Sequence, residues 1–575
     1  MNYFTDNKDL QFIFNSTDLT DIIRMWEKDF DQKELSDYGP CSVDDAVDNY
    51  RRVLDVAGDI AARIVAPLSD KLDTEPHRIE QGRVIYSEPL RRCVRALCQA
   101  DLMGCTISRK YGGLNLPNVI FTMLVEMISQ ADAGLQNIFG LQGISSIIEN
   151  FADEDLKATY LPRFAQGTAT GAMALTEDEA GSDLQNIKLK AEQEPDGTWR
   201  LSGVKRFITN GGAEVLLVLA RSEPGTTDGL GLSLFLCEGD ETVRVRRVEE
   251  KLGIHSSPTC EISFDRTPAF LIGERQRGLV TYVLALLNGA RLATAAQSVG
   301  IAQAAFNEAR PYAHARKQYG RRIEQLPPVA EMLTGMQIAI EGARALTYET
   351  ARIMDLSLGS SLRLHSGDLD AAEKKTLRKS AKKFERQTML LTSIAKYYCS
   401  EMSSVVTRNA MQVLGGSGYM RDYPVEKYYR DARITSIYEG TSQLQVLGAF
   451  RSVLSGTLEK YFEELKVKDP PRQQARLQKK LEGARVLLSQ TLEFLNSKKD
   501  NMLLDLCSRK IVDMGSEILI GYLFLRQSLA SNRKMKMARM FITAMEPRLK
   551  MNAQHIKRAD KGCIKDYPLI VGPPE

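Results

Sequence analysis

Residues 412–445 decide the fold and read QVLGGSGYMRDYPVEKYYRDARITSIYEGTSQLQ. Apolar residues recur every three or four positions on both sides of this stretch, which predicts helices over 370–415 and 440–465. Gly, Ser and Thr are dense between them, and such residues let backbone amides approach a ligand closely. We therefore interpret this joint between helices as a ligand-facing segment.

Helical periodicity governs most of the chain. Short runs rich in Val, Ile, Leu and Phe interrupt it from about Leu189, and the helical pattern returns after Gly278. The expected fold class is α+β, mainly α. We predict an N-terminal extension (1–45), an N-terminal helical domain (46–173), a central antiparallel β domain (174–278), a C-terminal helical bundle (279–452) and an appended helical domain (453–575).

Composition excludes several classes of function. The 575 residues carry 76 basic and 73 acidic side chains, which gives no electrostatic reason to expect a nucleic-acid partner. Nine cysteines without a Cys-x-x-Cys pair and five histidines without ligand spacing predict no metal site. The sequence has no Rossmann fingerprint, P-loop, export signal or apolar run long enough to span a bilayer, so we expect a cytoplasmic protein.

The near-neutral total charge hides an asymmetry. Residues 456–575 carry 23 Lys/Arg and 14 Asp/Glu, a net charge of +9, whereas residues 1–455 carry −6. Basic helices either face solvent in a bundle or meet an anionic surface. The second alternative predicts peripheral membrane contact through Lys534, Lys536, Arg539 and Lys550.

Three further segments share the character of residues 412–445. They are ALTEDEAGSDLQ (174–185), RFITNGG (206–212) and ARKQYG (315–320). Together with the first stretch, and in this order, they resemble the acyl-CoA dehydrogenase family over about residues 50–452, in its longer form with a C-terminal helical extension. YGGLNLP (111–117), KLGIHSSPTC (251–260) and NGARLA (288–293) also look like the family's equivalents.

The resemblance implies an FAD-dependent enzyme that introduces a double bond between Cα and Cβ of an acyl-CoA thioester. Glu439 matches the family's base, which abstracts the α-proton while flavin N5 takes the β-hydride. Such a base needs an apolar, water-excluded slot that raises its pKa. Some members carry the base one residue before the Arg of the NGARLA-like helix; here that residue is Ala290, so Glu439 stands alone.

The resemblance also implies the remaining site residues and partners. Electrons would pass to electron-transferring flavoprotein, and the chain would form a homodimer or a dimer of dimers, because the family's ADP-binding groups come from a neighbouring subunit. The substrate-binding residues expected are Ser182, Arg291, Tyr438 and Gly440. The FAD-binding residues expected are Leu175, Thr176, Ser182, Phe207, Thr209, Arg316, Tyr319, Gln412, Gly415, Gly416, Thr441 and Gln443.

The sequence departs from the family pattern and leaves alternatives open. Asp178 and Glu179 follow Thr176-Glu177 where the family has a proline, and Leu326-Pro327 replaces a Phe-Gln pair that contacts FAD. An acyl-CoA oxidase that reduces O2, or a non-catalytic scaffold on the same fold, would share most of these motifs. Small residues at Ala285, Gly289 and Ala290 predict a roomy acyl site without identifying the acyl group.

Overall fold

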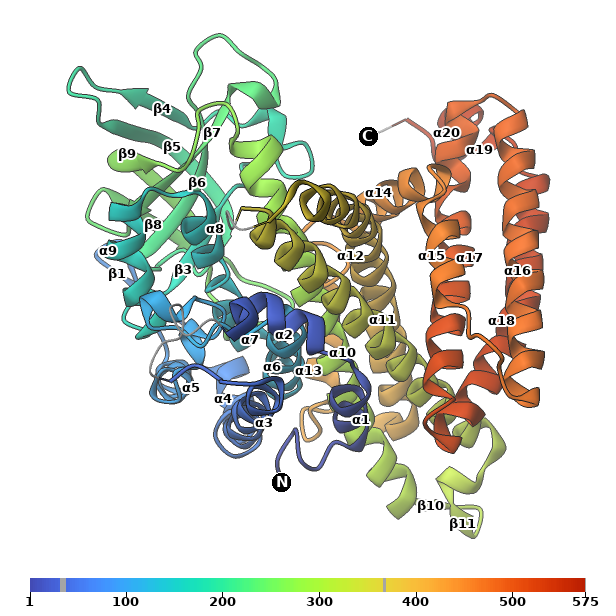
Figure 1. The fold of residues 1–575 in the computed structure, drawn as a ribbon. Helices are drawn as coiled ribbons and strands as arrows, with labels where there is room; N and C mark the ends of the chain where they lie inside the picture. The colour runs from blue at the N-terminus through green and yellow to red at the C-terminus, as the bar shows by residue number, and fades with distance from the viewer. Residues whose placement is uncertain (31–37, 366–368, 574–575) are drawn as a thin grey trace.

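The computed structural model describes residues 1–30, 38–365 and 369–573. A β domain lies at one side of the molecule, a bundle of long helices at its centre and an upright helical domain at the other side, as Figure 1 shows. The first helices of the chain lie in front of the bundle and below the β domain (Figure 1). This arrangement confirms the predicted α+β, mainly α, fold class.

The N-terminal helices form a layer against the bundle. The apolar helix α6 is buried along almost its whole length because it lies between α3 and α10. Residues before 46 belong to the same core, since Leu10, Ile13 and Ile23 are buried there. The elements of this layer are α1 (Lys8–Ser16), α2 (Thr20–Trp26), α3 (Val43–Ile60), α4 (Ser69–Thr74), the hairpin β1 (Arg78–Glu80) and β2 (Arg83–Ile85), α5 (Glu88–Gln99), α6 (Asn118–Ala131), α7 (Ala133–Leu141), α8 (Ile144–Phe151) and α9 (Glu154–Ala165).

The β domain is one seven-stranded sheet in the order β3-β6-β4-β5-β9-β7, with β8 paired to β9. Because β7 also pairs with β6, the sheet curls on itself. The prediction of a purely antiparallel domain was wrong for β3 and β4, which run parallel to β6; the other pairings are antiparallel. A long loop separates β3 from β4, so the chain can return in the same direction. The strands are β3 (Gly171–Ala174), β4 (Lys190–Gln193), β5 (Trp199–Thr209), β6 (Val215–Arg221), β7 (Leu232–Glu238), β8 (Val243–Val248) and β9 (Thr259–Leu271).

The central bundle supplies the frame of the site. A π-helical turn, η8 (Gly278–Val283), leads into α10, which packs against α6, α11 and α12. By length and composition alone, Gly278–Ala315 is the one stretch of the described residues that could span a membrane. Its second half is buried within the bundle. The elements are α10 (Leu284–Ala315), the hairpin β10 (Lys317–Gln318) and β11 (Arg321–Arg322), α11 (Pro327–His365), α12 (Ala371–Leu414), η10 (Gly415–Tyr419), α13 (Val425–Ile434) and α14 (Ser442–Leu454).

The appended domain stands beside the bundle. Its apolar helix α17 packs against α11 and α14 and is covered by α16 and α18. The domain therefore shares a continuous hydrophobic core with the bundle. Its helices are α15 (Thr457–Leu465), α16 (Arg472–Ser497), α17 (Asn501–Gln527), α18 (Asn532–Lys557), α19 (Gly562–Lys565) and α20 (Tyr567–Val571).

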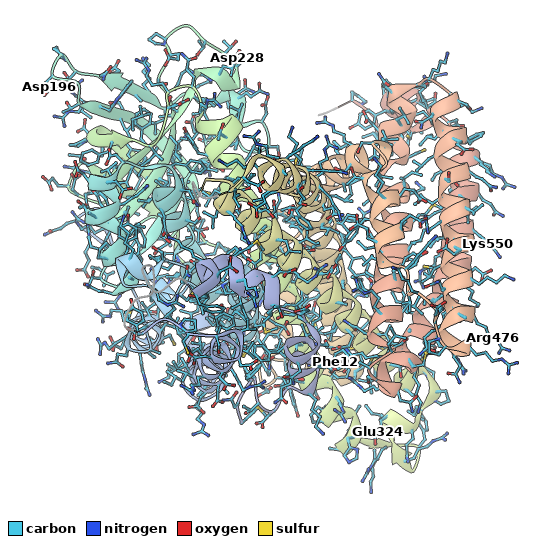
Figure 2. The ribbon with its side chains drawn as sticks, viewed as in Figure 1. Phe12, Asp196, Asp228, Glu324, Arg476 and Lys550 are labelled. Carbon is cyan, nitrogen blue, oxygen red and sulfur yellow. The ribbon has the colours of Figure 1, made fainter. Side chains whose placement is uncertain are left out.

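The structure corrects the role expected for Lys534. Its side chain is 2% exposed and its ammonium group pairs with Glu341 of α11 and with Asp9 of α1. A buried, paired lysine has no charge to offer a membrane surface, so Lys534 belongs instead to the contact between the two ends of the chain. Lys550 lies on the outer face of the domain, as Figure 2 shows, and pairs with Glu546 one turn earlier.

Candidate active site

Glu439 lies in a tight turn between α13 and α14. Glu439 and Gly440 both have positive φ, +55° and +86°, a conformation that costs little at glycine and is uncommon for glutamate. Thr441 follows as the N-cap of α14, and its hydroxyl accepts a hydrogen bond from the Leu444 amide. The sequence Glu-Gly-Thr thus completes the connection from α13 and begins α14 within three residues.

Two side chains from neighbouring helices hold this turn. The fully buried Lys396 of α12 donates a hydrogen bond from Nζ to the Gly440 carbonyl at 2.7 Å. Gln445, on the first turn of α14, donates from Nε2 to the carbonyls of Glu439 and Gly440 at 3.2 and 3.3 Å. The strained turn is therefore fixed by hydrogen bonds to its own carbonyl groups.

Burial shifts the pKa values of Glu439 and Lys396. It raises the pKa of the Glu439 carboxyl, and the positive charges of Lys396 and Arg291 act in the opposite direction. Burial also lowers the pKa of Lys396 to about 7. The Glu439 oxygen Oε2 is buried and has no hydrogen-bond partner within the described part of the chain. Such a carboxylate is a stronger base than one in water.

Arg291 and Tyr438 flank the carboxylate. Arg291 donates to Asn288 Oδ1 at 3.2 Å, whereas its Nε is buried and finds no partner among the described residues. The Tyr438 hydroxyl donates to Gln297 Oε1 and to Asn137 Oδ1, the latter at 3.3 Å. Tyr438 is thereby anchored to α10 and α7, while Arg291 keeps an unused donor beside Glu439.

Glu439, Tyr438 and Arg291 line a cavity of about 2270 Å³. This volume exceeds the usual 300–1,000 Å³ of a small-molecule site, so it can hold more than one small group. Ala285, Gly289 and Ala290 also line it, as expected of a roomy acyl site. The wall comes from α2, α6, α7, α8, the start of α10, the end of α11 and the start of α12.

The predicted contact loop of the β domain, residues 174–183, is tied to β5 beneath it. The fully buried Lys205 donates to the Leu175 carbonyl at 2.8 Å and to Glu177 at 2.9 Å, and the Arg206 amide donates to the Thr176 carbonyl. Ser182 lies on the exposed part of the loop. Leu175, Thr176 and Ser182 do not line the cavity wall.

Phe207 and Thr209 lie at the C-terminal end of the strand β5. A register irregularity between Lys205 and Ile208 breaks the alternation of the strand, and Phe207 has a φ of +59°. Its aromatic ring is 52% exposed, which is unusual for phenylalanine, and Thr209 lines the cavity. This edge of the β domain is therefore open to a planar ligand.

The remaining predicted FAD residues gather at the other end of the bundle. Arg316 caps the C-terminal end of α10, and Tyr319, which is 89% exposed, lies in the turn of the projecting β10–β11 hairpin, beside the position of Glu324 in Figure 2. Gln412, Gly415 and Gly416 lie at the end of α12. Gln412 is about 24 Å along the helix from Lys396, at 1.5 Å per residue. Within one chain, the predicted FAD residues therefore form two separate groups. The first group lies on the side of Glu439 and comprises Thr441, Gln443 and the residues of the β domain.

Both groups have the free surface that FAD requires. The exposed ring of Phe207 and the unpartnered Arg291 Nε suit a flavin next to the cavity. At the other end, a Cβ added to Gly415 or Gly416 would meet no atom within 4 Å, so the backbone there is open to a ligand. Among the described residues, His, Cys, Asp and Glu form no group that could hold a metal ion.

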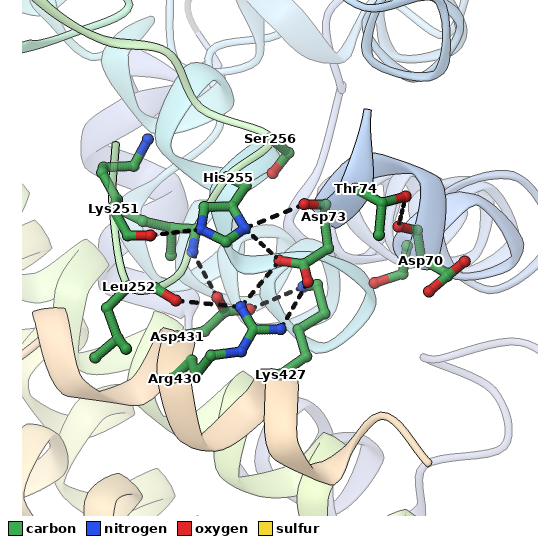
Figure 3. Close-up of polar contacts among 12 residues, drawn as sticks. Asp70, Asp73, Thr74, Lys251, Leu252, His255, Ser256, Lys427, Arg430 and Asp431 are labelled. Atoms are coloured by element: carbon green, nitrogen blue, oxygen red, sulfur yellow. Dashed lines mark hydrogen bonds and ion pairs between the residues drawn. The ribbon is translucent and has the colours of Figure 1, made fainter. Parts of the chain in front are cut away.

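A charged network joins three domains next to this site, as Figure 3 shows. Asp73 of α4 accepts hydrogen bonds from Arg430 of α13 at 2.6 Å and from His255 of the KLGIHSSPTC loop at 2.9 Å. The other ring nitrogen of His255 meets the Lys251 carbonyl at 2.7 Å. Lys427 bridges Asp431 and Asp132 nearby. Helix α13, which leads into the Glu439 turn, is thus fixed to the N-terminal and β domains.

Sequence reasoning missed the residues that hold the Glu439 turn. Lys396 stands in the run SIAKYYCS (393–400), where it reads as an ordinary helix position. Its buried partner is a backbone carbonyl 44 residues away, which leaves no signal in the local sequence. A lysine on the apolar face of a predicted core helix was the one available sign.

Comparison with family models places most of the chain, from residue 48 to residue 562, in one family. Residues 48–168 match "Acyl-CoA dehydrogenase, N-terminal domain", 172–267 its "middle domain", and 277–364 with 367–454 its "C-terminal domain". Residues 454–562 match a further model, "Acyl-CoA dehydrogenase C terminal". The appended helices therefore belong to the family as well.

Individual proteins similar to this chain are also acyl-CoA dehydrogenases. The chain is 32% identical over 443 residues to 3-methylmercaptopropionyl-CoA dehydrogenase of Ruegeria pomeroyi, covering 72% of this chain and 71% of that protein. It is 34% identical to the short-chain-specific acyl-CoA dehydrogenase of Clostridium acetobutylicum, over 64% and 89% of the two. The fold of a Bacillus anthracis acyl-CoA dehydrogenase complexed with FAD matches with a TM-score of 0.75 at 24% identity, over 88% of each chain. The chain thus belongs to the acyl-CoA dehydrogenase family, FAD-dependent oxidoreductases that act on CH–CH bonds.

Proposed function

We propose that this protein dehydrogenates an acyl-CoA thioester to the 2-enoyl-CoA with Glu439 as the base. The observation that carries the proposal is the buried, unpartnered Glu439 oxygen in the wall of a large cavity. A carboxylate in that position has a lone pair free for the proton beside the thioester carbonyl. Bound FAD would supply the acceptor for the hydride from the β-carbon, held by Phe207, Thr209, Thr441 and Gln443.

The protein also offers a donor for the charge that develops on the thioester oxygen. The backbone N–H of Glu439 donates to no acceptor within the described part of the chain. An N–H fixed in a rigid turn stabilises a developing enolate without having to reorganise. The hydrogen bonds from Lys396 and Gln445 to the carbonyls of this turn keep that N–H oriented.

We propose a dimer in which each subunit completes its partner's FAD site. Arg316, the projecting hairpin with Tyr319 and the end of α12 lie far from Glu439 on the same chain, so a second copy must bring them to the flavin side. A symmetric pair would exchange these groups reciprocally. Electron-transferring flavoprotein is proposed as the acceptor, and H2O2 release during turnover would identify an oxidase instead.

The test of the base is Glu439→Gln. The amide keeps the size of the side chain but cannot take a proton, so FAD should stay bound while acyl-CoA no longer bleaches the flavin spectrum. Glu493→Gln, an exposed change in the appended domain, is the matched control. Residual bleaching in Glu439→Gln at more than a hundredth of the control rate would refute the assignment.

A further inference from the structure

The cavity wall formed by α6 and α7 carries two polar groups that no other described residue satisfies. Thr122 of α6 is 1% exposed, and its hydroxyl has no hydrogen-bond partner within the described part of the chain. Asn137 of α7 is 7% exposed, and its Nδ2 lacks a partner among the same residues. Both residues line the cavity. Because an unpaired polar group inside a protein costs free energy, each marks a place where a ligand can complete a hydrogen bond.

Thr122 differs from other buried helix threonines in what its hydroxyl contacts. A threonine within a helix can donate to the carbonyl four residues earlier. Thr294 and Thr350 do so, at 2.8 and 2.7 Å. The Thr122 hydroxyl makes no such bond to the carbonyl of Asn118 and therefore remains available at the cavity wall.

The orientation of Asn137 is fixed by the contacts of its own oxygen. Asn137 Oδ1 accepts a hydrogen bond from Gln297 Nε2 at 2.9 Å and lies 3.3 Å from the Tyr438 hydroxyl. With its oxygen held in this way, the amide leaves Nδ2 as a donor for a ligand. Since Tyr438 precedes Glu439 in the chain, this donor lies within the length of one tyrosine side chain from the segment that carries the base.

The end of the cavity at α6 and α7 is enclosed. Both helices are buried along almost their whole length, and Phe121 of α6 packs against Phe139 of α7 with ring centroids 5.5 Å apart. The opposite end of the cavity, at the first turns of α12, is exposed. Because phosphate charges are costly to bury, the CoA part of a substrate needs the exposed end. The acyl chain would then extend from Glu439 toward α6 and α7.

The charged groups of the enclosed end disfavour an anionic ligand. Arg109 lines the cavity, but both terminal nitrogens of its guanidinium are bound to the buried Glu27 carboxylate, at 2.5 and 3.0 Å. Burial raises the pKa of the Glu149 carboxyl, which also lines the cavity, so this part of the wall is unfavourable to a negative charge. A neutral oxygen is therefore a better partner than a carboxylate for the unpaired hydroxyl and amide.

We propose that the enclosed end of the cavity selects acyl chains that carry a neutral oxygen, as an ether or a hydroxyl, which accepts hydrogen bonds from Thr122 and Asn137. The inference rests on the proposed function, because it takes Glu439 as the position of the α-carbon. A plain alkyl chain would leave both buried donors unpaired. A site built to hydrogen-bond one group of its substrate discriminates against the analogue that lacks this group.

The test compares octanoyl-CoA with three ethers in which an oxygen replaces the methylene at chain position 5, 6 or 7. The replacement changes the shape of the chain little and adds only an acceptor. Each ligand is titrated calorimetrically into FAD-loaded protein with Glu439→Gln, so that binding is measured without turnover. We expect the best ether to bind about tenfold more tightly than octanoyl-CoA, or about 1.4 kcal/mol.

Two threonine variants in the same background assign this preference. Thr122→Val removes the free hydroxyl at nearly constant size, and it should lower the preference for the ether below about threefold because one of two hydrogen bonds is lost. Thr350→Val is the matched control, since Thr350 is equally buried, is bonded within its own helix and does not line the cavity. It should keep the preference at about tenfold.

The outcomes separate this inference from the dehydrogenase function. A preference below about threefold for all three ethers, with Thr122 intact, would overturn the inference, and so would equal preferences in the Thr122→Val and Thr350→Val proteins. The comparison of ligands needs no change at Thr122, so it decides the matter even if Thr122→Val does not fold. Failure of all four acyl-CoAs to bleach the flavin of the wild-type protein would reject the dehydrogenase function, whereas the titrations would still report on the enclosed end.

Discussion

Lys396→Met is expected to make the protein more stable and less active. Methionine fills a similar volume without a charge. The fall in the pKa of Lys396 from 10.5 to about 7 makes its buried ammonium about 5 kcal/mol less favourable than in water, at 1.36 kcal/mol per pKa unit. Losing the bond to the Gly440 carbonyl costs about 1–3 kcal/mol, and Gln445 still donates to that oxygen. The balance is a gain of about 2–4 kcal/mol near pH 7.

The stability gain expected from Lys396→Met depends on pH. A lysine with a lowered folded pKa binds fewer protons when folded, so its penalty is complete below about pH 7 and disappears above pH 10.5. The gain from Lys396→Met should therefore be largest in acid and vanish in strong base. Removing the ammonium also raises the pKa of Glu439 further, because Lys396 lowers it. The rise of flavin reduction with pH should move to higher pH.

The assay has two parts on FAD-loaded protein. Urea unfolding at pH 6, 7.5 and 9 measures the stability change, and single-turnover flavin reduction across the same range measures the activity change. Lys396→Arg keeps a cation in place and is the control for the pH profile. A variant that is less stable than wild type at every pH, or whose pH profile coincides with that of wild type, would refute the reasoning.

Two further predictions concern the domain contacts. Glu341→Gln removes the buried carboxylate that pairs with Arg344 and Lys534, and leaves each cation with one other carboxylate partner, Glu126 and Asp9; urea unfolding should show a loss of about 1–3 kcal/mol. Arg533→Ala, an exposed change in the same contact, should cost less than about 1 kcal/mol; equal losses would contradict the buried pairing. His255→Gln should flatten the dependence of Tm on pH. Both ring nitrogens face acceptors and the pKa of His255 is raised, so its contribution is complete below pH 6.5 and lost as the pH rises through the folded value. Parallel Tm profiles of variant and wild type would show that His255 does not titrate with folding.

The sequence was sufficient for features that depend on local order. Helical periodicity located α12 to within one residue at each end, and the motif of residues 412–445 indicated a connection between helices, where Glu439 lies. Both signals lie within one element or one connection.

Features that depend on pairing between distant segments were not predictable. The parallel pairing of β3 with β6 depends on which edge of the sheet is free after 40 intervening residues. The interpretation of Lys534 as a surface charge failed because its partners, Asp9 and Glu341, lie 525 and 193 positions away. A lysine in an amphipathic helix looks the same in sequence whether it faces water or a buried glutamate.

Separation of the predicted FAD residues into two groups allows a direct test of the dimer. If Glu439 and Arg316 act in the same site but come from different subunits, chains with Glu439→Gln and chains with Arg316→Glu should each be inactive alone. A mixed dimer would combine one doubly damaged site with one intact site. Random assortment makes half the dimers mixed, so an equimolar refolded mixture should recover about a quarter of wild-type activity per chain. No recovery in a mixture shown to contain heterodimers would place both residues in the same subunit's site, and Arg316, at the C-terminal end of α10, would then have to reach the Glu439 side of the bundle within one chain.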